Sequence, residues 1–276
     1  MISMRVGIVQ MSSNENKERN LNKALHFVQK AINEGAELIV LPELFNYLPP
    51  QMTKEGHLKN AEDMNGPSIK VLEKMAKSHN VAIIAGSITE LDRGKLYNTS
   101  FVISNRGVLG KYRKVHLFKF GGIDETSVFE AGNKPEVINL YGVKIGLTIC
   151  FDLRFPELFR TETLMGADLI VNVAAFLEKT GKVHWMPLLR ARSIENQVFL
   201  IAANQAKIKG QNHKYYGHSC IIDPWGRVVA KAKSDECVIT GKIDLKRIEE
   251  IRKKMPLLEM RRVDVYDIMK TSRTPK

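Results

Sequence analysis

Hydrophobic residues along the chain follow two alternating patterns, short apolar runs and longer segments with helical spacing. The run at 6–11 is rich in Val and Ile, which is typical of a strand. In the segment 17–33, apolar residues recur every three or four positions, as on one face of a helix. Gly35 predicts the end of this helix, and the run at 37–41, apolar from Leu38 on, predicts a strand buried on both faces.

The same alternation continues along the chain, with no internal repeat and no linker-like stretch. Two pairs of strands flank turn residues, Asn105–Gly107 in one pair and Pro224–Gly226 in the other, and each pair predicts a hairpin. Strands that alternate with helices, together with hairpins, predict an α/β fold with mixed sheets, and the number of strands favours two sheets. Further helices are expected at 67–79, 156–165, 183–196 and 245–253, and further strands at 81–86, 96–104, 108–113, 143–149, 169–174, 198–203, 219–223, 228–232 and 238–243.

The composition is that of an ordinary globular chain. Its 276 residues are 44% hydrophobic and 26% charged, which is enough apolar material for one large core. The longest apolar runs are far shorter than the roughly 20 residues of a membrane helix. The first residues, MISMRVGIVQM, lack the layout of a signal peptide. We therefore expect a cytoplasmic protein.

The formal net charge of +12 has two interpretations, a surface that binds nucleic acid and a solvated surface rich in lysine. Lys and Arg are interspersed with Glu and Asp, as in KNAED and DLKRIEEIRKK, and no basic stripe carries aromatic residues. The densest basic stretch, 261–276, lies at the C-terminal end. This pattern favours the solvated surface, so neither nucleic acid nor a membrane is expected as a partner.

The three cysteines are too few, and odd in number, for a disulfide framework, and no two have the spacing of zinc ligands. Cys220 and Cys237 lie in strand patterns, which indicates core positions. Cys150 instead ends an apolar strand and precedes a turn that leads into a helix. Backbone N–H groups at such a position favour a thiolate and can bind an oxyanion. A small buried core residue is the alternative interpretation of Cys150.

Two charged residues also follow predicted strands. Glu43 comes directly after a buried strand, at the end where ligands of α/β folds gather, although an exposed loop carboxylate is the alternative. Lys114 ends the strand that begins near Val108. In an apolar site its ammonium would be a fixed positive charge, whereas a plain surface lysine is the alternative.

Three segments together resemble one family: LPELF around Glu43, YRKVHLF around Lys114 and CFDLRFPE from Cys150. In this order and spacing they resemble the signature segments of the nitrilase, or carbon–nitrogen hydrolase, superfamily, and the resemblance covers nearly the whole chain. It implies that Cys150 is a nucleophile, Glu43 its general base and Lys114 an oxyanion partner. It also implies a second glutamate near the lysine, which matches Glu125, with Glu130 as the alternative.

These residue types predict an amidase that works through a thioester. Glu43 takes the proton of Cys150, and the thiolate attacks the amide carbonyl. Lys114 and the backbone N–H of Phe151 hold the oxyanion, while Glu43 gives its proton to the leaving ammonia. Glu43 then activates the water that hydrolyses the thioester. This chemistry requires neither a metal nor an organic cofactor.

Residues after the cysteine indicate a branch of the superfamily. Arg154 is suited to bind a substrate carboxylate through two parallel hydrogen bonds, and a salt bridge to Asp152 or Glu157 is the alternative. The segments HWMPLLRARSIENQVFLIAANQ and YGHSCIIDPWGRVVA resemble the omega-amidase and deaminated-glutathione amidase branch, which implies a small dicarboxylic acid monoamide as substrate. Phe176 is expected to line the pocket. The stretch TGKVHW departs from the TGPAHW-like stretch of this branch, so Lys182 is expected to alter the pocket mouth.

The resemblance further implies a four-layer α-β-β-α sandwich with two mixed sheets. Members of the superfamily pair into dimers, so we expect a homodimer or a higher homo-oligomer. We expect residues 1–258 to form the hydrolase domain, and residues 259–276 to be a C-terminal segment that contacts the partner subunit.

Other functions stay open at this point. A nitrilase or an N-carbamoyl amide hydrolase would use the same glutamate, lysine and cysteine, because only the pocket distinguishes them from an amidase. A non-catalytic basic binding protein would have no reactive thiol. Tyr215, Tyr216 and His218 are further candidates for the site, with packing as the favoured interpretation.

Overall fold

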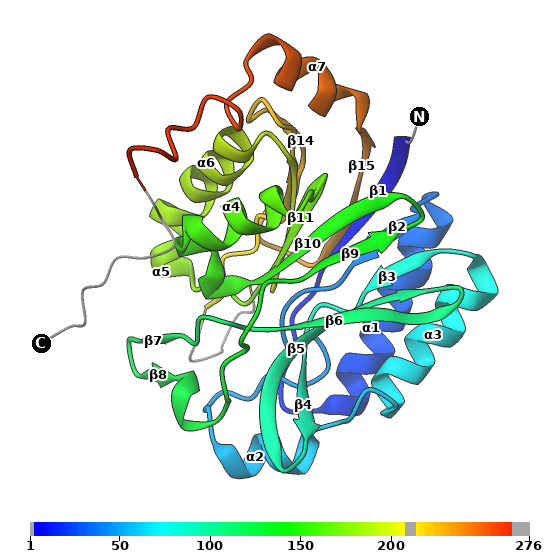
Figure 1. The fold of residues 1–276 in the computed structure, drawn as a ribbon. Helices are drawn as coiled ribbons and strands as arrows, with labels where there is room; N and C mark the ends of the chain where they lie inside the picture. Colours follow the sequence, from blue (N-terminus) through cyan, green and yellow to red (C-terminus); the bar gives the residue numbers. More distant parts are fainter. Residues whose placement is uncertain (1–2, 208–213, 267–276) are drawn as a thin grey trace, which may run out of the picture.

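The computed structural model describes residues 3–207 and 214–266, and two mixed β-sheets lie at its centre (Figure 1). The first sheet has the order β15-β1-β2-β3-β5-β4, with β6 paired to β5, and the second has the order β14-β13-β12-β11-β10-β9. The strands of the first sheet are β1 (Ser3–Gln10), β2 (Leu38–Val40), β3 (Ala82–Ile84), β4 (Ile88–Asp92), β5 (Lys95–Ser104), β6 (Gly107–Arg113) and β15 (Cys237–Asp244). Those of the second are β9 (Val137–Leu140), β10 (Val143–Ile149), β11 (Leu169–Ala174), β12 (Phe199–Asn204), β13 (Cys220–Ile222) and β14 (Val228–Lys231). A separate hairpin consists of β7 (Lys119–Phe120) and β8 (Ile123–Asp124).

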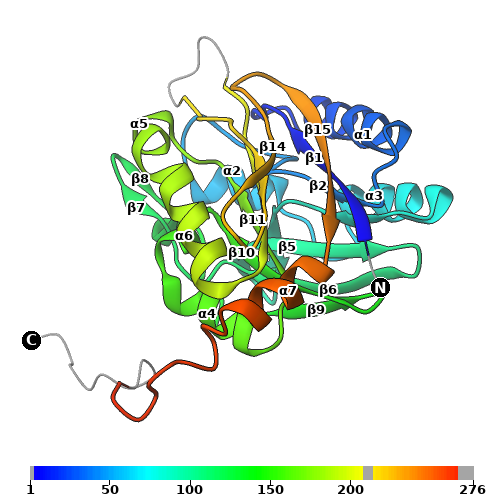
Figure 2. The same cartoon turned by 90° about the horizontal axis from the view of Figure 1, so that it is seen from above.

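Helices cover the outer face of each sheet, so the predicted four-layer sandwich is confirmed (Figure 2). On the first sheet lie α1 (Lys17–Asn33) and α3 (Pro67–His79), and on the second lie α4 (Pro156–Leu164) and α6 (Met186–Asn196). The remaining elements are α2 (Lys54–Asn60), α5 (Glu178–Thr180), α7 (Lys246–Lys254), two 3-10 helices, η1 (Glu125–Ser127) and η2 (Cys150–Arg154), and the π-helix η3 (Gly181–Trp185).

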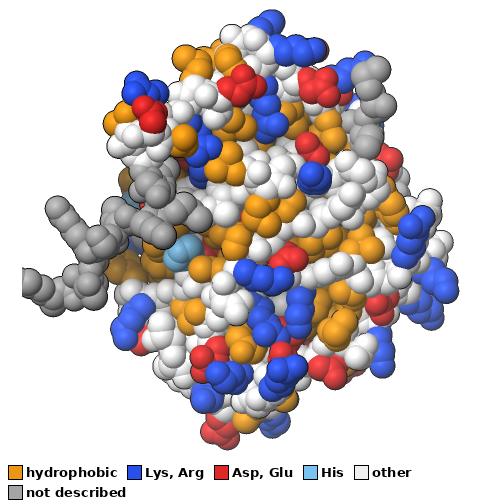
Figure 3. Space-filling view, viewed as in Figure 1, with side chains coloured by type: hydrophobic (Ala, Val, Ile, Leu, Met, Phe, Trp, Pro, Cys, Tyr) orange, Lys and Arg blue, Asp and Glu red, His pale blue; other side chains and the backbone are white. Residues whose placement is uncertain are grey.

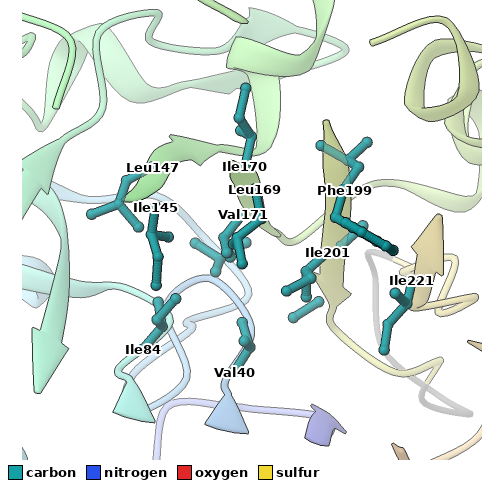
Figure 4. Close-up of a cluster of buried hydrophobic side chains, with 14 of the residues drawn as sticks. Val40, Ile84, Ile145, Leu147, Leu169, Ile170, Val171, Phe199, Ile201 and Ile221 are labelled. Carbon is teal, nitrogen blue, oxygen red and sulfur yellow. The ribbon is translucent and has the colours of Figure 1, made fainter. Parts of the chain in front are cut away.

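Strand residues alternate between two cores, as a period of two requires. Ile8, Val40 and Ile84 point between the sheets, whereas their neighbours Val9, Ile39 and Ile83 pack against α1 and α3. Figure 4 shows Val40 and Ile84 of the first sheet facing residues of the second sheet, with Ile145 and Val171 among them. The two sheets are thus joined by apolar packing of side chains.

The hydrophobic pattern predicted most elements correctly. Helices α1 and α3 have the predicted bounds, and both predicted hairpins are present as β5–β6 and β13–β14. The predicted helix at 183–196 is instead a π-helical turn followed by α6. Strands β4, β7, β8 and β9 and helices α2 and α5 were not predicted.

Other expectations concern the surface and the chain ends. In the part of the chain that the structure describes, no helix is long and apolar enough to cross a membrane. On the face shown in Figure 3, Lys and Arg side chains are spread out with Asp and Glu among them, as the sequence predicts. Residues 267–276 of the predicted C-terminal segment lie outside the described residues.

Candidate active site

The turn that follows β2 positions Glu43. It packs against the turn after β3, where the Leu44 N–H donates to Ser87 Oγ at 2.9 Å. Gly86 has φ +39°, and a Cβ there would lie 2.0 Å from the Pro42 carbonyl oxygen. Any other residue would push the backbone before Glu43 aside. Glu43 itself is 2% exposed, so the turn places a carboxylate in the interior.

Lys114 follows β6 directly and is 1% exposed. Its backbone N–H donates to the Asn98 carbonyl of β5 at 2.9 Å, which extends the pairing of the two strands. Its ammonium Nζ lies 2.8 Å from Glu43 Oε1 and 2.8 Å from Glu125 Oε2. Two glutamates from different elements therefore enclose one buried ammonium.

Glu125 begins η1, directly after the β7–β8 hairpin. Its Oε2 accepts the Phe118 N–H at 2.7 Å, so the carboxylate also closes the base of the hairpin. The Asn98 side chain donates to Glu43 Oε1 at 2.9 Å and to Glu125 Oε1 at 3.5 Å. Glu130, the alternative to Glu125, is exposed and stands apart from this cluster.

Cys150 lies at the end of β10 and begins η2. Its φ of +47° is uncommon for a residue other than glycine and requires support from the surrounding structure. Cys150 is 8% exposed and lines the same pocket as Glu43, Lys114 and Glu125. The structure thus brings the four predicted catalytic residues together from both sheets.

Burial and charge set the resting state of this cluster. Burial alone would lower the pKa of Lys114, but the charges of Glu125 and Glu43 outweigh it and raise the pKa. Burial, reinforced by the charge of Glu43, raises the pKa of the Cys150 thiol well above its ordinary value. Burial also raises the pKa of Glu125, although its ion pair with Lys114 opposes this shift. The resting site therefore contains an ammonium and a neutral thiol that needs a base.

The predicted substrate-binding residues lie in different places. Arg154 and Phe176 line the pocket, and the Arg154 guanidinium stacks 4.5 Å from the centre of the Phe176 ring. The Phe151 side chain is not among the described residues that line the pocket; it packs edge-on against Phe118 and Phe155. Its backbone N–H lies in the first turn of η2, where helix donors have no partner within the helix.

No carboxylate of the described residues pairs with Arg154. Asp152 accepts hydrogen bonds from Tyr112 and His116 instead, and Glu157 is exposed on α4. The salt bridge considered as an alternative for Arg154 is therefore wrong for both residues. Burial lowers the pKa of Arg154, but a guanidinium stays charged in proteins. The Arg154 guanidinium is thus available in the pocket to bind an anionic group of a substrate.

Of the three aromatic candidates, Tyr215 alone lines the pocket, and burial raises its pKa. Tyr216 and His218 stack on each other with ring centres 4.1 Å apart, as packing predicts. Lys182 is exposed and lies 3.2 Å from Glu178, and it is not among the described pocket residues.

Sequence reasoning missed Asn98 and most of the apolar wall. Asn98 had one weak signal, since asparagine is depleted in strands and here stands within the strand-like KLYNTSF. The apolar wall residues had none, because loops far apart in the chain supply them. They are Leu44, Leu48, Met52, Phe118, Ile123 and Leu177, joined by Thr180.

Comparison with known proteins places this geometry in a family. The model of the carbon–nitrogen hydrolase family matches residues 5–253. The omega-amidase NIT2 of Xenopus tropicalis is 39% identical over 97% of this chain and 98% of its own length, and that of Homo sapiens is 35% identical over the same shares. The crystal structure of Saccharomyces cerevisiae Nit3, described as a member of branch 10 of the nitrilase superfamily, has a TM-score of 0.86 and 34% identity, covering 94% of this chain and 97% of that one.

The chain belongs to the carbon–nitrogen hydrolase family. It is therefore an enzyme that hydrolyses carbon–nitrogen bonds, and the family assignment made from the three signature segments is confirmed.

Proposed function

We propose that this enzyme is a cysteine-dependent amidase that releases ammonia from a small amide bearing a carboxylate. One observation carries the proposal: Lys114 Nζ lies 2.8 Å from both Glu43 and Glu125, in a pocket that also contains the Cys150 thiol. A base, a fixed positive charge and a nucleophile within one pocket are the parts that acyl transfer needs.

The first half-reaction forms the thioester. The neutral Cys150 thiol gives its proton to Glu43 as sulfur bonds to the amide carbon. The carbonyl oxygen becomes an oxyanion between Lys114 Nζ and the Phe151 N–H, where fixed donors stabilise it. Glu43 then passes its proton to the nitrogen, and the C–N bond breaks to release ammonia.

The second half-reaction runs through the same groups. Glu43 takes a proton from water, and the resulting hydroxide attacks the thioester carbon. The oxyanion forms again at Lys114, the C–S bond breaks, and the proton on Glu43 returns to the Cys150 sulfur. Glu125 and Asn98 keep Lys114 and Glu43 in place through both steps, since they contact these two side chains directly.

Arg154 supports a carboxylate-bearing substrate. Its guanidinium lines the pocket with no carboxylate partner among the described residues, and it lies beside Phe176. A guanidinium pairs with a carboxylate through two hydrogen bonds. The relatives named omega-amidase agree with this choice of substrate.

An ammonia-release screen tests the proposal. It compares glutaramate, succinamate and α-ketoglutaramate with N-carbamoyl amino acids, propionamide and propionitrile. We expect the three carboxylate-bearing amides to have the highest kcat/KM. We expect Arg154→Ala to reduce their kcat/KM by about 10²-fold, the effect of losing a charged hydrogen-bond pair, and to change propionamide hydrolysis little. Cys150→Ala is the inactive control.

Other outcomes of the screen would redirect the proposal. Turnover of propionitrile above every amide would make the enzyme a nitrilase, and preference for N-carbamoyl compounds would make it a carbamoyl hydrolase. Equal use of propionamide and glutaramate by the wild type would remove Arg154 as the anchor. Amide turnover that survives in Cys150→Ala would contradict the nucleophile itself.

We further propose a homodimer. Exposed or half-exposed apolar residues recur on α6 at three- and four-residue spacing: Pro187, Ala191 and Ile194. The turn carrying Trp225, which is 47% exposed, packs beside Ile194. An exposed patch of this kind marks an interaction surface. In the proposed C-terminal segment, Met260, Val263 and Val265 are also exposed apolar residues and support its contact with a partner.

A further inference from the structure

The side chain of Asp152, two residues after the nucleophile, is fully buried and holds an unusual set of donors. Its Oδ2 accepts the Ile149 N–H at 2.8 Å and the Tyr112 hydroxyl at 2.8 Å. Its Oδ1 accepts the His116 N–H at 3.0 Å and lies 2.7 Å from His116 Nδ1. Neither Lys nor Arg of the described residues pairs with it. Four donors from three residues therefore satisfy this carboxylate.

These donors come from both sheets of the sandwich. Ile149 ends β10 of the second sheet and directly precedes Cys150. Tyr112 and His116 belong to the end of β6 and the loop after it, two residues before and two residues after Lys114. The carboxylate of Asp152 thus joins the two chain segments that carry the nucleophile and the oxyanion partner.

This link fixes two segments of the site that strand pairing does not connect. No hydrogen-bonded strand pairing connects β6 with β10, because the described strands place them in different sheets. Apolar packing between sheets is not directional, so it leaves their sliding less restricted than a hydrogen bond does. Cys150 also has its φ of +47°, which persists only where the surroundings fix it.

Two further contacts hold the same turn in place around Asp152. The His116 ring stacks on Phe155 with ring centres 3.6 Å apart and planes 5° apart. Arg192 Nε donates to the Leu153 carbonyl at 3.1 Å from the α6 side. The turn at 150–155 is therefore held by α6 on one side and by His116 on the other. Asp152 provides its hydrogen bonds to the segment that contains Lys114.

We propose that Asp152 is a positioning residue that sets the separation between the Cys150 sulfur and the Lys114 ammonium. It does not touch the substrate. Without its carboxylate, the turn bearing Cys150 shifts relative to Glu43 and Lys114, which both follow strands of the first sheet. A misplacement of about 1 Å can reduce a rate by about 10²-fold. This inference rests on the proposed amidase chemistry for its turnover readout.

The test compares Asp152→Asn with Glu162→Gln. Glu162 is a second buried carboxylate nearby, on α4, and no side chain of the described residues donates a hydrogen bond to it. We expect D152N to reduce kcat on the best amide by about 10²-fold, with KM within about threefold. We expect E162Q to keep both values. A role in stability alone would lower the Tm of D152N and leave the kcat of the folded protein unchanged, which would overturn the proposal.

Alkylation of Cys150 by iodoacetamide gives a readout that needs no turnover. Peptide mass spectrometry follows Cys150 and, as an internal reference, Cys237. We expect D152N to slow alkylation of Cys150 and not of Cys237. If the wild type hydrolyses no amide but this slowing is present, the proposed function fails and the positioning role stands.

Tyr112→Phe provides a milder variant should D152N not fold. It removes one of the four donors and keeps the aromatic ring in the core. We expect its kcat to fall about tenfold, as one hydrogen bond to a charged group predicts, with KM again unchanged. An unaltered kcat and an unaltered alkylation rate in Y112F would overturn the proposal.

Discussion

Lys114 is enclosed by two carboxylates, and the negative charge of Glu125 acts on the thiol as well as on the lysine. This charge raises the pKa of Lys114, and it adds to the burial and the Glu43 charge that raise the pKa of Cys150. Glu125→Gln removes it. We expect the thiol pKa to fall, so the pH profile of Cys150 alkylation moves to lower pH. We expect amide hydrolysis to slow by about 10²-fold, because Lys114 loses a partner that holds it toward the oxyanion.

The two effects of Glu125→Gln have opposite signs. Misfolding would also slow hydrolysis and, by exposing the buried Cys150 thiol, speed its alkylation, so circular dichroism must first show that E125Q has the wild-type fold. Glu130→Gln is the matched control, since it removes a carboxylate from an exposed position five residues later. Alkylation and hydrolysis rates of E130Q should equal those of the wild type. An alkylation profile of E125Q that moves to higher pH would contradict the electrostatic account of this site.

Asn98 illustrates which site residues a sequence can reveal. Glu43, Lys114 and Cys150 each stand in a local motif, and each follows a strand that the hydrophobic pattern predicts. Asn98 lies inside β5, and it reaches the two glutamates only because β5 pairs with β6. Its role comes from tertiary structure, so the only local signal was an asparagine within a strand pattern, and no motif spacing indicated its partners.

The turns that follow the strands position the catalytic side chains, and a substitution of Gly86 tests this. Gly86→Ala would place a Cβ 2.0 Å from the Pro42 carbonyl, so the backbone leading into Glu43 must shift. We expect kcat to fall by about 10²-fold as the base moves. Gly94, which connects β4 and β5, also has a positive φ but has open space around it.

Gly94→Ala is therefore a control for backbone strain alone. In both variants, a side chain at positive φ lowers the free energy of unfolding by about 1–3 kcal/mol. Urea unfolding measures this loss of stability in each. We expect G94A to keep the wild-type kcat. Equal kcat values for G86A and G94A would show that the close approach to Pro42 does not position Glu43.

Elements with strong local patterns were predictable, and those held by distant partners were not. Helices α1 and α3 have clear apolar stripes and end signals, and their predicted bounds are the observed ones. Strand β4 contains Glu90, which is 2% exposed because Lys111 and Arg113 of β6 neutralise it. Such a strand looks polar in sequence, since the partners that bury its charge lie about twenty residues away.

The sandwich as a whole decides where the site forms. Glu43 and Lys114 come from the first sheet, whereas Cys150 and Phe176 follow strands of the second. The pocket therefore exists only when the two sheets are packed together. The three signature segments of the family predict that these residues lie in one pocket. The hydrophobic pattern alone does not predict this, because it leaves the relative placement of the two sheets open.

The proposed dimer provides the last prediction. Ile194 is 43% exposed on α6, beside the turn that carries Trp225. Ile194→Glu places a charge on this apolar surface, and burying an unpaired charge in an interface is strongly unfavourable. We expect the wild type to be a dimer, and I194E a monomer, in size-exclusion chromatography with light scattering at micromolar concentration. Leu58→Glu is the matched control, because Leu58 is 51% exposed on α2, far from α6 in Figure 1. A wild type that is monomeric, or an I194E variant that stays dimeric while L58E dissociates, would remove α6 from the interface.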